Sequence, residues 1–193
     1  MILYLFFFFA RQLGIDVFRE TVMSSTEFRR AVILQTLKLI EQDRDGIDVN
    51  KQLIKDILHM LQELKFYKSD FESTFLEHTV AYYKQESNRL LNTLSVWDYI
   101  HHAYKRQQEE TETRISHYLN IQTKHPLLNA VTDQLVYQNV NTILNRGFEE
   151  MMNKKMYDTL STLYTLLLNN SNMSLLRASF GDYIKVKQCC LSS

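Results

Sequence analysis

Glycine and proline are scarce in this chain, with four glycines and one proline among 193 residues. A β-sheet protein uses these residues at its many turns, whereas a chain of long helices needs few of them. No segment of the sequence shows a convincing strand pattern. The shortage therefore predicts an all-α fold of long helices joined by short turns.

Apolar residues recur at spacings of three and four along most of the chain, which predicts about eight helices. Ser95 and either Asp48 or Asn50 can cap a following helix, because their side chains accept hydrogen bonds from its first turn. Gly46 suits the left-handed position after a helix, and Pro126 suits a first helical turn. The expected helices cover residues 12–24, 27–43, 50–64, 67–94, 96–119, 124–144, 156–168 and 173–187.

Two helices and one turn carry more detailed expectations. The polar run KRQQEETETR at 105–114 is typical of a solvated face in the middle of the helix 96–119. The segment NNSN at 169–172 predicts the turn between the last two helices. The apolar face of the third helix is expected to consist of Leu53, Ile57, Leu61 and Leu64.

The opening stretch MILYLFFFFA has no charged residue and contains four consecutive phenylalanines, Phe6 to Phe9. It is too short for a bilayer, which needs roughly 20 apolar residues. It also lacks the basic segment and small-residue cleavage site of a signal peptide. We interpret it as part of a buried helix or as sequence outside the mature protein, with a weak targeting signal as the alternative.

The charge balance excludes one large class of function. The chain has 22 basic and 22 acidic residues and a formal net charge of zero. A protein that binds nucleic acid by neutralising phosphates usually has a basic excess or a basic stripe. The two cysteines, Cys189 and Cys190, are adjacent and cannot build a disulfide framework, which favours a reducing compartment.

The sequence contains no recognisable catalytic or metal-binding motif. The chain lacks the His-Glu-x-x-His, GxGxxG and GxSxG patterns and a phosphate-binding loop. His101 and His102 are adjacent, so they point to different sides of a helix. The sequence therefore predicts no catalytic residue, no metal site and no cofactor. The acidic residues Glu109, Glu110 and Glu112 are expected to pair with Lys105, Arg106 and Arg114.

One stretch carries a family resemblance. FYKSDFESTFLEHTVAYYKQES, from Phe66 to Ser87, resembles the long third helix of a cullin repeat. The stretches LKLIEQDRDGIDVNKQLIKDIL upstream, and WDYIHHAYKRQQEETETRISHYLNIQTKHPL and DTLSTLYTLL downstream, are similar to neighbouring cullin segments. The resemblance covers residues 12–187. The motif consists of Tyr67, Phe71, Glu72, Phe75, Leu76, Thr79, Tyr82, Tyr83 and Glu86.

The resemblance implies an all-α fold in which long-helix cullin repeats stack into a right-handed helical-repeat stalk. The spacing between Leu64 and Tyr67 looks most like the cullin-four class. Two departures stand out, because the acidic stretch between Arg106 and Arg114 is one residue longer than the pattern and Gln107 replaces a leucine. Either departure can shift the helix register locally.

The resemblance also implies a domain division and a chain truncated at both ends. The cullin homology domain, which recruits the RING protein and carries the modifier-acceptor lysine, is not matched. The divisions are an unmatched apolar start at 1–11, the last helix of repeat one at 12–25, repeat two at 26–146, the start of repeat three at 147–187 and an unmatched tail at 188–193.

As a function, the resemblance implies a non-catalytic scaffold segment of a cullin-RING ubiquitin ligase, located in the nucleus and cytoplasm. Its implied partner is a substrate adaptor of the DNA-damage-binding type. The RING protein is reached only through the unmatched C-terminal domain, and neither nucleic acid nor a membrane is a direct partner. The fifth helix of repeat one corresponds to about 12–23, where the candidate adaptor contacts are Leu13, Asp16, Val17 and Glu20.

Two alternatives remain open at this point. An apolar stripe is often part of a core, so Leu13 and Val17 can instead pack against the helix 27–43. A vesicle-tethering protein of the exocyst type also consists of stacked long helices without catalytic residues. Association with tethering partners alone would favour that second function.

Overall fold

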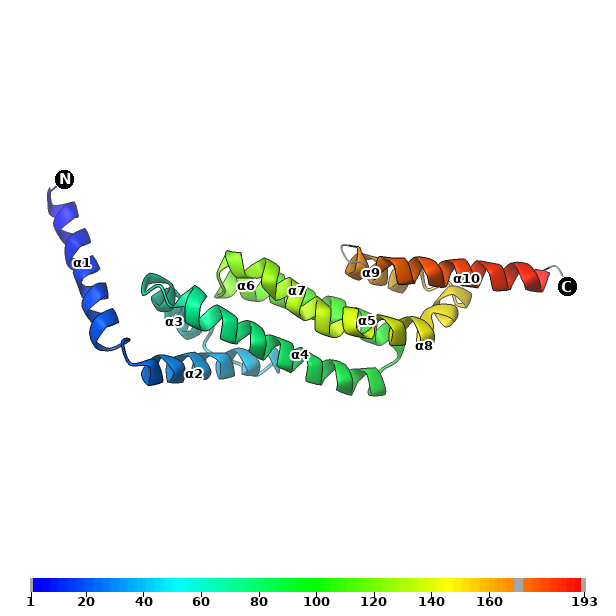
Figure 1. The fold of residues 1–193 in the computed structure, drawn as a ribbon, viewed down its shortest axis with the longest axis horizontal. Coiled ribbons are helices and arrows are strands. Elements are labelled where there is room, and N and C mark those ends of the chain that lie inside the picture. The colour runs from blue at the N-terminus through cyan, green and yellow to red at the C-terminus, as the bar shows by residue number, and fades with distance from the viewer. Residues whose placement is uncertain (1, 169–171, 192–193) are drawn as a thin grey trace. The chain divides into compact units, whose positions relative to one another are not determined.

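The computed structural model describes residues 2–168 and 172–191, and these ranges contain helices and no strand (Figure 1). This confirms the all-α fold. Side chains are described for residues 9–168 and 172–188. The expectations for the side chains of Phe6 to Phe8, for most of the turn at 169–172 and for the pair Cys189 and Cys190 therefore lie outside the described residues.

The helices appear in the following order along the chain. The α-helices are α1 (Ile2–Thr21), α2 (Thr26–Arg44), α3 (Lys51–Glu63), α4 (Ser73–Thr93), α5 (Val96–Gln108), α6 (Ile115–His117), α7 (Lys124–Leu135), α8 (Val140–Asn153), α9 (Tyr157–Leu167) and α10 (Met173–Leu191). The π-helical segments are η1 (Tyr67–Glu72) and η2 (Glu109–Arg114), and the 3-10 segments are η3 (Ile121–Thr123) and η4 (Tyr137–Asn139).

The chain divides into two compact units. The first unit comprises Met1–His78 and Arg114–Thr123, and the second comprises Thr79–Thr113 and Lys124–Ser193. The first contains α1 to α3 with η1, α6 and η3, and the second contains α5 and α7 to α10.

In the first unit, α3 packs against α2, η1 and α6. Helix α2 begins at the N-cap Ser25, whose hydroxyl accepts a 3.3 Å hydrogen bond from the amide of Phe28. Gly46 follows α2 with a φ of +80°, which confirms its left-handed role. The apolar core of these two helices consists of Ile33, Leu37, Ile40, Ile54, Leu58 and Leu61.

The expected buried face of α3 was wrong in one part. Leu53 is 46% exposed and Ile57 is half-buried, while Ile54 and Leu58 are buried. Asn50 caps the helix by accepting a hydrogen bond from the amide of Leu53, which places Leu53 in the solvated first turn. The buried face of α3 starts at Ile54 and continues at spacings of four and three to Leu58 and Leu61.

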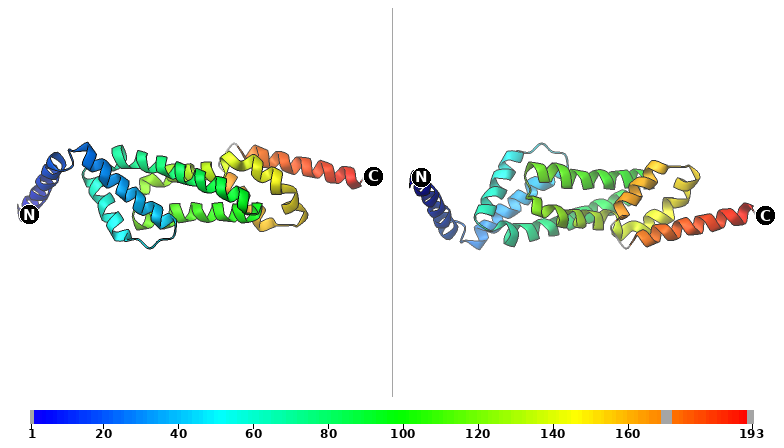
Figure 2. Two further views of the ribbon diagram at one scale, coloured as in Figure 1. Left: turned by 90° about the horizontal axis from the view of Figure 1, so that it is seen from below. Right: turned by 90° about the horizontal axis from the view of Figure 1, so that it is seen from above.

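In the second unit, α5 packs on α7, α8 and α9, and α10 packs on α8 (Figure 2). Ser95 is the N-cap of α5, as expected, and accepts a hydrogen bond from the amide of Asp98. Gly147 of α8 permits close packing on Val96, because a Cβ at this position would lie 2.6 Å from a Val96 methyl carbon.

The expected single helix over 96–119 was wrong. Helix α5 ends at Gln108 and the chain continues as the π-helical segment η2. A π-helix takes one more residue per hydrogen-bonded turn than an α-helix. This is the acidic stretch in which the sequence indicated one extra residue and a local shift of register.

The expected solvated face at 105–114 was wrong in part, since Lys105, Gln108, Glu112 and Thr113 are exposed but other side chains of the stretch are buried. Glu110 is fully buried and Arg114 is 5% exposed. Positions 103, 107, 110 and 114 continue the 3/4 spacing of the buried side of α5, so periodicity and not local polarity decides which side chains point inward. Gln107 lies on this face and donates a 2.9 Å hydrogen bond to the hydroxyl of Thr132.

The expected helix over 124–144 is interrupted, since α7 ends at Leu135 and η4 precedes α8. Side chains complete the backbone hydrogen bonds at this break. The hydroxyl of Tyr99 donates to the carbonyl of Leu135 at 2.6 Å, and the Asn139 amide donates to the carbonyl of Gln134 at 2.9 Å. Neither glycine nor proline marks the interruption, so the local sequence did not reveal it.

The boundaries of two further expected helices change. Helix α1 begins at Ile2, so the apolar start and the segment predicted from residue 12 form one helix. The expected helix over 67–94 begins with the π-helical segment η1 before α4.

Candidate functional site

Helix α1 presents an apolar stripe to solvent. Phe9, Leu13 and Val17 are spaced four residues apart, which places them on one side of the helix. Leu13 is 66% exposed and Val17 is 51% exposed. Such exposure contradicts the alternative that these two side chains pack against α2. Exposed apolar residues gathered on one side are typical of an interaction surface.

The other two candidate contacts, Asp16 and Glu20, differ from each other. Glu20 is exposed, whereas Asp16 is half-buried. The carboxylate of Asp16 accepts hydrogen bonds from Gln12 at 3.3 Å and from Arg19 at 3.0 Å. Asp16 is therefore engaged within the helix, while Leu13, Val17 and Glu20 remain accessible.

Two arginines hold α1 against the end of α3. Arg11 forms an ion pair with the carboxylate of Glu63. Arg19 donates hydrogen bonds to the carbonyl oxygens of Leu64 at 3.2 Å and Glu63 at 3.5 Å. A cation at the C-terminal end of a helix is favoured by the helix dipole. These contacts engage one side of α1, whereas Leu13 and Val17 lie exposed on the opposite side.

A groove lies between α1 and α3, with a cavity volume of about 410 Å³. Helix α1 contributes Gly14, Ile15 and Phe18 to its lining, and α3 contributes His59 and Met60 among others. A Cβ at Gly14 would meet no atom within 4 Å, so the glycine leaves the groove open there. The groove adjoins the arginine contacts described above.

The N-terminal half of the cullin-like motif is a buried aromatic ladder in the first unit. The rings of Tyr67 and Phe71 lie 5.1 Å apart, and those of Phe71 and Phe75 lie 5.5 Å apart. The Tyr67 hydroxyl lies 2.9 Å from the hydroxyl of Thr123, and Glu72 accepts a 2.8 Å hydrogen bond from the same Thr123. Burial raises the pKa of Tyr67, which keeps its hydroxyl protonated as a donor.

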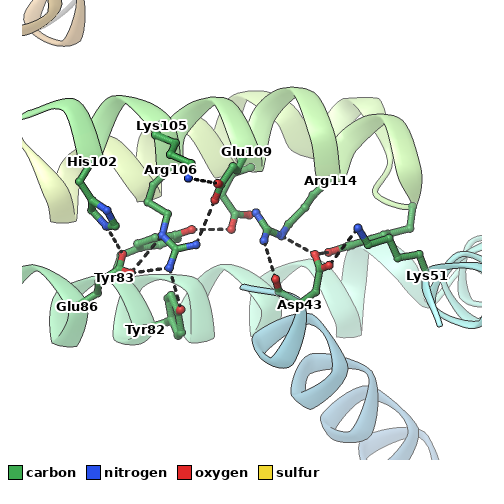
Figure 3. Close-up of polar contacts among 12 residues, drawn as sticks. Asp43, Lys51, Tyr82, Tyr83, Glu86, His102, Lys105, Arg106, Glu109 and Arg114 are labelled. Carbon is green, nitrogen blue, oxygen red and sulfur yellow. Dashed lines mark hydrogen bonds and ion pairs between the residues drawn. The ribbon is translucent and has the colours of Figure 1, made fainter. Parts of the chain in front are cut away.

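The C-terminal half of the motif belongs to a buried polar cluster in the second unit (Figure 3). Arg106 donates to one carboxylate oxygen of Glu86 at 2.7 and 3.1 Å, and His102 lies 3.4 Å from the other oxygen. The hydroxyl of Tyr83 donates a 2.6 Å hydrogen bond to Glu110. Arg106 and Glu86 neutralise each other's charge at a site where Glu86 is only 5% exposed.

The balance of charges sets the ionisation of this cluster. Burial raises the pKa of Glu86, but the approach of the His102 ring to 3.4 Å and the hydrogen bonds and charge of Arg106 outweigh burial and lower this pKa below its ordinary value. Arg106 also pairs with Glu109 at 3.1 Å, and its Nη2 lies 3.4 Å from the hydroxyl of Tyr82. The expected pairing of Glu109 with Lys105 and Arg106 is confirmed. The remaining motif side chains are Thr79, which is buried, and Leu76, which is half-buried.

A second polar cluster lies within the first unit. Arg114 donates to the carboxylate of Asp43 at 2.9 Å, and the Tyr118 hydroxyl donates to the same oxygen at 3.0 Å. Lys51 lies 3.4 Å from the other carboxylate oxygen (Figure 3). Asp43 was not singled out by the sequence, because nothing local distinguishes it from a solvated helix-end acid.

The described residues contain neither a metal-ligand group nor a membrane-spanning helix. No group of three histidine, cysteine, aspartate or glutamate side chains among them is arranged to hold a metal ion. No helix within the described part of the chain is long and apolar enough to cross a bilayer. His101 lies 3.1 Å from the hydroxyl of Thr159 and His102 faces Glu86, so the adjacent histidines do point to different neighbours.

Comparison with known proteins agrees with this geometry. The family model described as the cullin alpha solenoid domain matches residues 9–190. Human Cullin-4A is 32% identical over 175 residues, which is 90% of this chain and 23% of that protein. Cullin-4 of Dictyostelium discoideum is 30% identical over 90% of this chain, and Cullin-3A of Arabidopsis thaliana is 25% identical over 83%.

The chain spans about a quarter of the length of these relatives, namely 23% of human Cullin-4A and 21% of the Dictyostelium protein. The matched residues include α1 from Phe9 onward and the buried motif from Tyr67 to Glu86. An all-α architecture, the match to the solenoid domain and the similarity to Cullin-4A lead to one assignment: the chain belongs to the cullin family.

Proposed function

We propose that this chain is a non-catalytic scaffold segment of a cullin-RING ubiquitin ligase. In this role α1 contacts a substrate adaptor of the DNA-damage-binding type, and the helices that follow link the adaptor toward the catalytic module. The protein acts in the nucleus and cytoplasm, which imaging of a fluorescently tagged chain tests.

One observation carries the proposal. Leu13 and Val17 are exposed on α1 of a chain that matches the cullin solenoid domain, although both are apolar and regularly spaced. Full burial of such a side chain stabilises by about 1.5–3 kcal/mol relative to full exposure, and Leu13 and Val17 forgo the part that belongs to their exposed surface. A partner surface that covers them recovers that free energy, and Glu20 beside them supplies a charged rim.

The non-catalytic part of the proposal rests on the buried charges. Glu86 is engaged with Arg106 in the second unit, and Asp43 with Arg114 in the first. Mutually paired and buried carboxylates serve the packing of helices and are not positioned as accessible acids or bases.

A binding experiment with a matched control tests the adaptor contact. The DNA-damage-binding adaptor is immobilised, and the chain is passed over it as wild type, as Leu13→Glu and as Ile121→Glu. Ile121 is 67% exposed and Leu13 is 66% exposed, so the two substitutions perturb solubility alike. We expect Leu13→Glu to weaken binding about 10- to 30-fold and Ile121→Glu to leave it unchanged.

The outcomes separate the candidate functions. Equal loss of binding in both variants would show that the contact does not depend specifically on α1. Absence of wild-type binding to the adaptor, together with binding to subunits of a vesicle-tethering complex, would replace the ligase function with the tethering alternative.

A further inference from the structure

The carbonyl oxygens of residues 60–62, near the C-terminal end of α3, all accept hydrogen bonds from backbone amides. Lys65 adopts a left-handed conformation with a φ of 63°, which turns the chain sharply after the helix. The turn brings the amide of Phe66 back onto α3, beside the amides of Leu64 and Lys65, which already bond to carbonyl oxygens of the helix. The backbone pairs are Leu64 to Met60 at 3.0 Å, Lys65 to Gln62 at 3.0 Å and Phe66 to Leu61 at 2.8 Å.

The next two carbonyl oxygens, those of Glu63 and Leu64, receive their hydrogen bonds from α1. Arg19 donates to Leu64 through Nε at 3.2 Å and to Glu63 through Nη2 at 3.5 Å. These two nitrogens form one edge of the planar guanidinium group, so a single side chain spans both oxygens. A lysine has one ammonium group and cannot reproduce this two-point contact.

Asp16 fixes the opposite side of the same guanidinium group. Its carboxylate accepts a 3.0 Å hydrogen bond from Nη1 of Arg19, three residues further along α1. The side chain of Arg19 is 27% exposed and that of Asp16 is 41% exposed. The ion pair therefore restricts the rotamer of Arg19 and aims its other edge at α3.

We infer that Arg19 is a positioning residue for partner binding and that Asp16 acts through Arg19 instead of contacting the partner. Arg19 holds α1 on the end of α3, and this orientation presents Leu13 and Val17 outward. The inference rests on the proposed function for its binding consequence. It also reassigns Asp16, one of the four candidate contacts, from the interface to the support behind it.

The positioning claim is tested without any partner by measuring a distance within the first unit. Spin labels are placed at the exposed positions Ala10 and Lys55 in a chain whose two cysteines are replaced by serine. We expect a narrow distance distribution for the otherwise wild-type chain and a broad one for Arg19→Ala. Arg19→Lys should be intermediate, since it keeps the charge but loses the second contact. Arg30→Ala, on the exposed side of α2, is the matched control and should leave the distribution narrow.

The binding claim is tested on the immobilised adaptor with a double-mutant cycle. If Arg19→Ala lowers the docked population of α1 to about a tenth, the apparent affinity falls about tenfold. Asp16→Ala should weaken binding in the wild-type background and should add almost nothing in the Arg19→Ala background.

Each outcome supports or overturns a defined part of the inference. A narrow distance distribution in Arg19→Ala overturns the positioning role, whatever the adaptor does. Additive effects of the two substitutions on affinity show that Asp16 contacts the adaptor directly. If the wild-type chain fails to bind, the proposed function fails, while the distance measurement still decides whether Arg19 positions α1.

Discussion

Helix α1 and the segment Gln107–Arg114 depart from ordinary burial in opposite directions. On α1 the apolar side chains of Leu13 and Val17 are exposed, whereas Glu110 and Arg114 are buried. Apolar residues outside leave a surface for which a partner is expected. Charged residues inside need their partners within the fold, because an unpaired buried charge is strongly destabilising. We therefore expect the exposed apolar residues to serve binding and the buried charged residues to serve packing.

This contrast in burial predicts that substitutions in the two regions affect different properties. Changes in the buried polar cluster should lower the free energy of unfolding and affect binding only through it. Changes on the exposed stripe of α1 should alter binding and leave the free energy of unfolding nearly unchanged. The predictions that follow test this division, starting with the largest expected effect.

Arg106→Ala should destabilise the chain most. It leaves Glu86, which is 5% exposed, without its main counter-charge. We expect a loss of about 3–5 kcal/mol in the free energy of unfolding, measured by urea denaturation. Lys105→Ala is the matched control, because the Lys105 side chain is 75% exposed and pairs with Glu109 only at 3.7 Å. A control that destabilises as much as Arg106→Ala would contradict the assignment.

The pH dependence of stability should reveal Glu86. Its pKa in the folded chain lies below the ordinary 4.5, so its stabilising contribution is present above 4.5 and is lost as the pH falls through the lowered value. Glu86→Gln cannot titrate and should flatten this part of the acid unfolding profile. Parallel acid profiles for the variant and wild type would show that the carboxylate does not provide this dependence.

Tyr99→Phe should have a smaller effect at neutral pH and a distinct one in alkali. Loss of the hydroxyl leaves the Leu135 carbonyl without its 2.6 Å donor, which costs about 1–3 kcal/mol. Burial raises the pKa of Tyr99 to about 12, although a hydrogen bond with Ser87 opposes it. The stabilisation by the neutral phenol is therefore present below pH 10 and lost between pH 10 and about 12. Alkaline unfolding followed by circular dichroism should be shallower in the variant.

Val17→Glu should have the smallest effect on stability. Val17 is 51% exposed and Ile184 on α10 is 52% exposed, so Ile184→Glu is a matched control. We expect both variants to change the free energy of unfolding by no more than about 0.5 kcal/mol. A loss of several kcal/mol in Val17→Glu alone would show that Val17 belongs to the core and that the exposed stripe has been misassigned.

The sequence predicted the fold class and most helices because their signals are local. Glycine shortage, 3/4 spacing and the caps Ser95 and Asn50 depend only on neighbours along the chain. The break after Leu135 could not be predicted in this way, because its hydrogen bonds come partly from Tyr99, 36 residues away. The burial of Glu110 could not be predicted from composition, because the polar residues around it are typical of a solvated face.

The candidate site was predictable only in part. Spacing placed Leu13 and Val17 on one side of α1, and the family resemblance suggested their role. The contact of Arg19 with the end of α3 joins residues 45 positions apart and depends on the left-handed conformation of Lys65. A lysine carries no sequence signal for that conformation, so the support behind the site required the structure.

Hydrogen exchange with and without the DNA-damage-binding adaptor tests the central claim most directly. The amides of α1 and α10 are compared within the same chain, since both helices carry exposed apolar side chains such as Val17 and Val186. We predict that the adaptor slows exchange in α1 and leaves α10 unchanged. Protection of α10 without protection of α1 would contradict the assignment of α1 as the adaptor-binding surface.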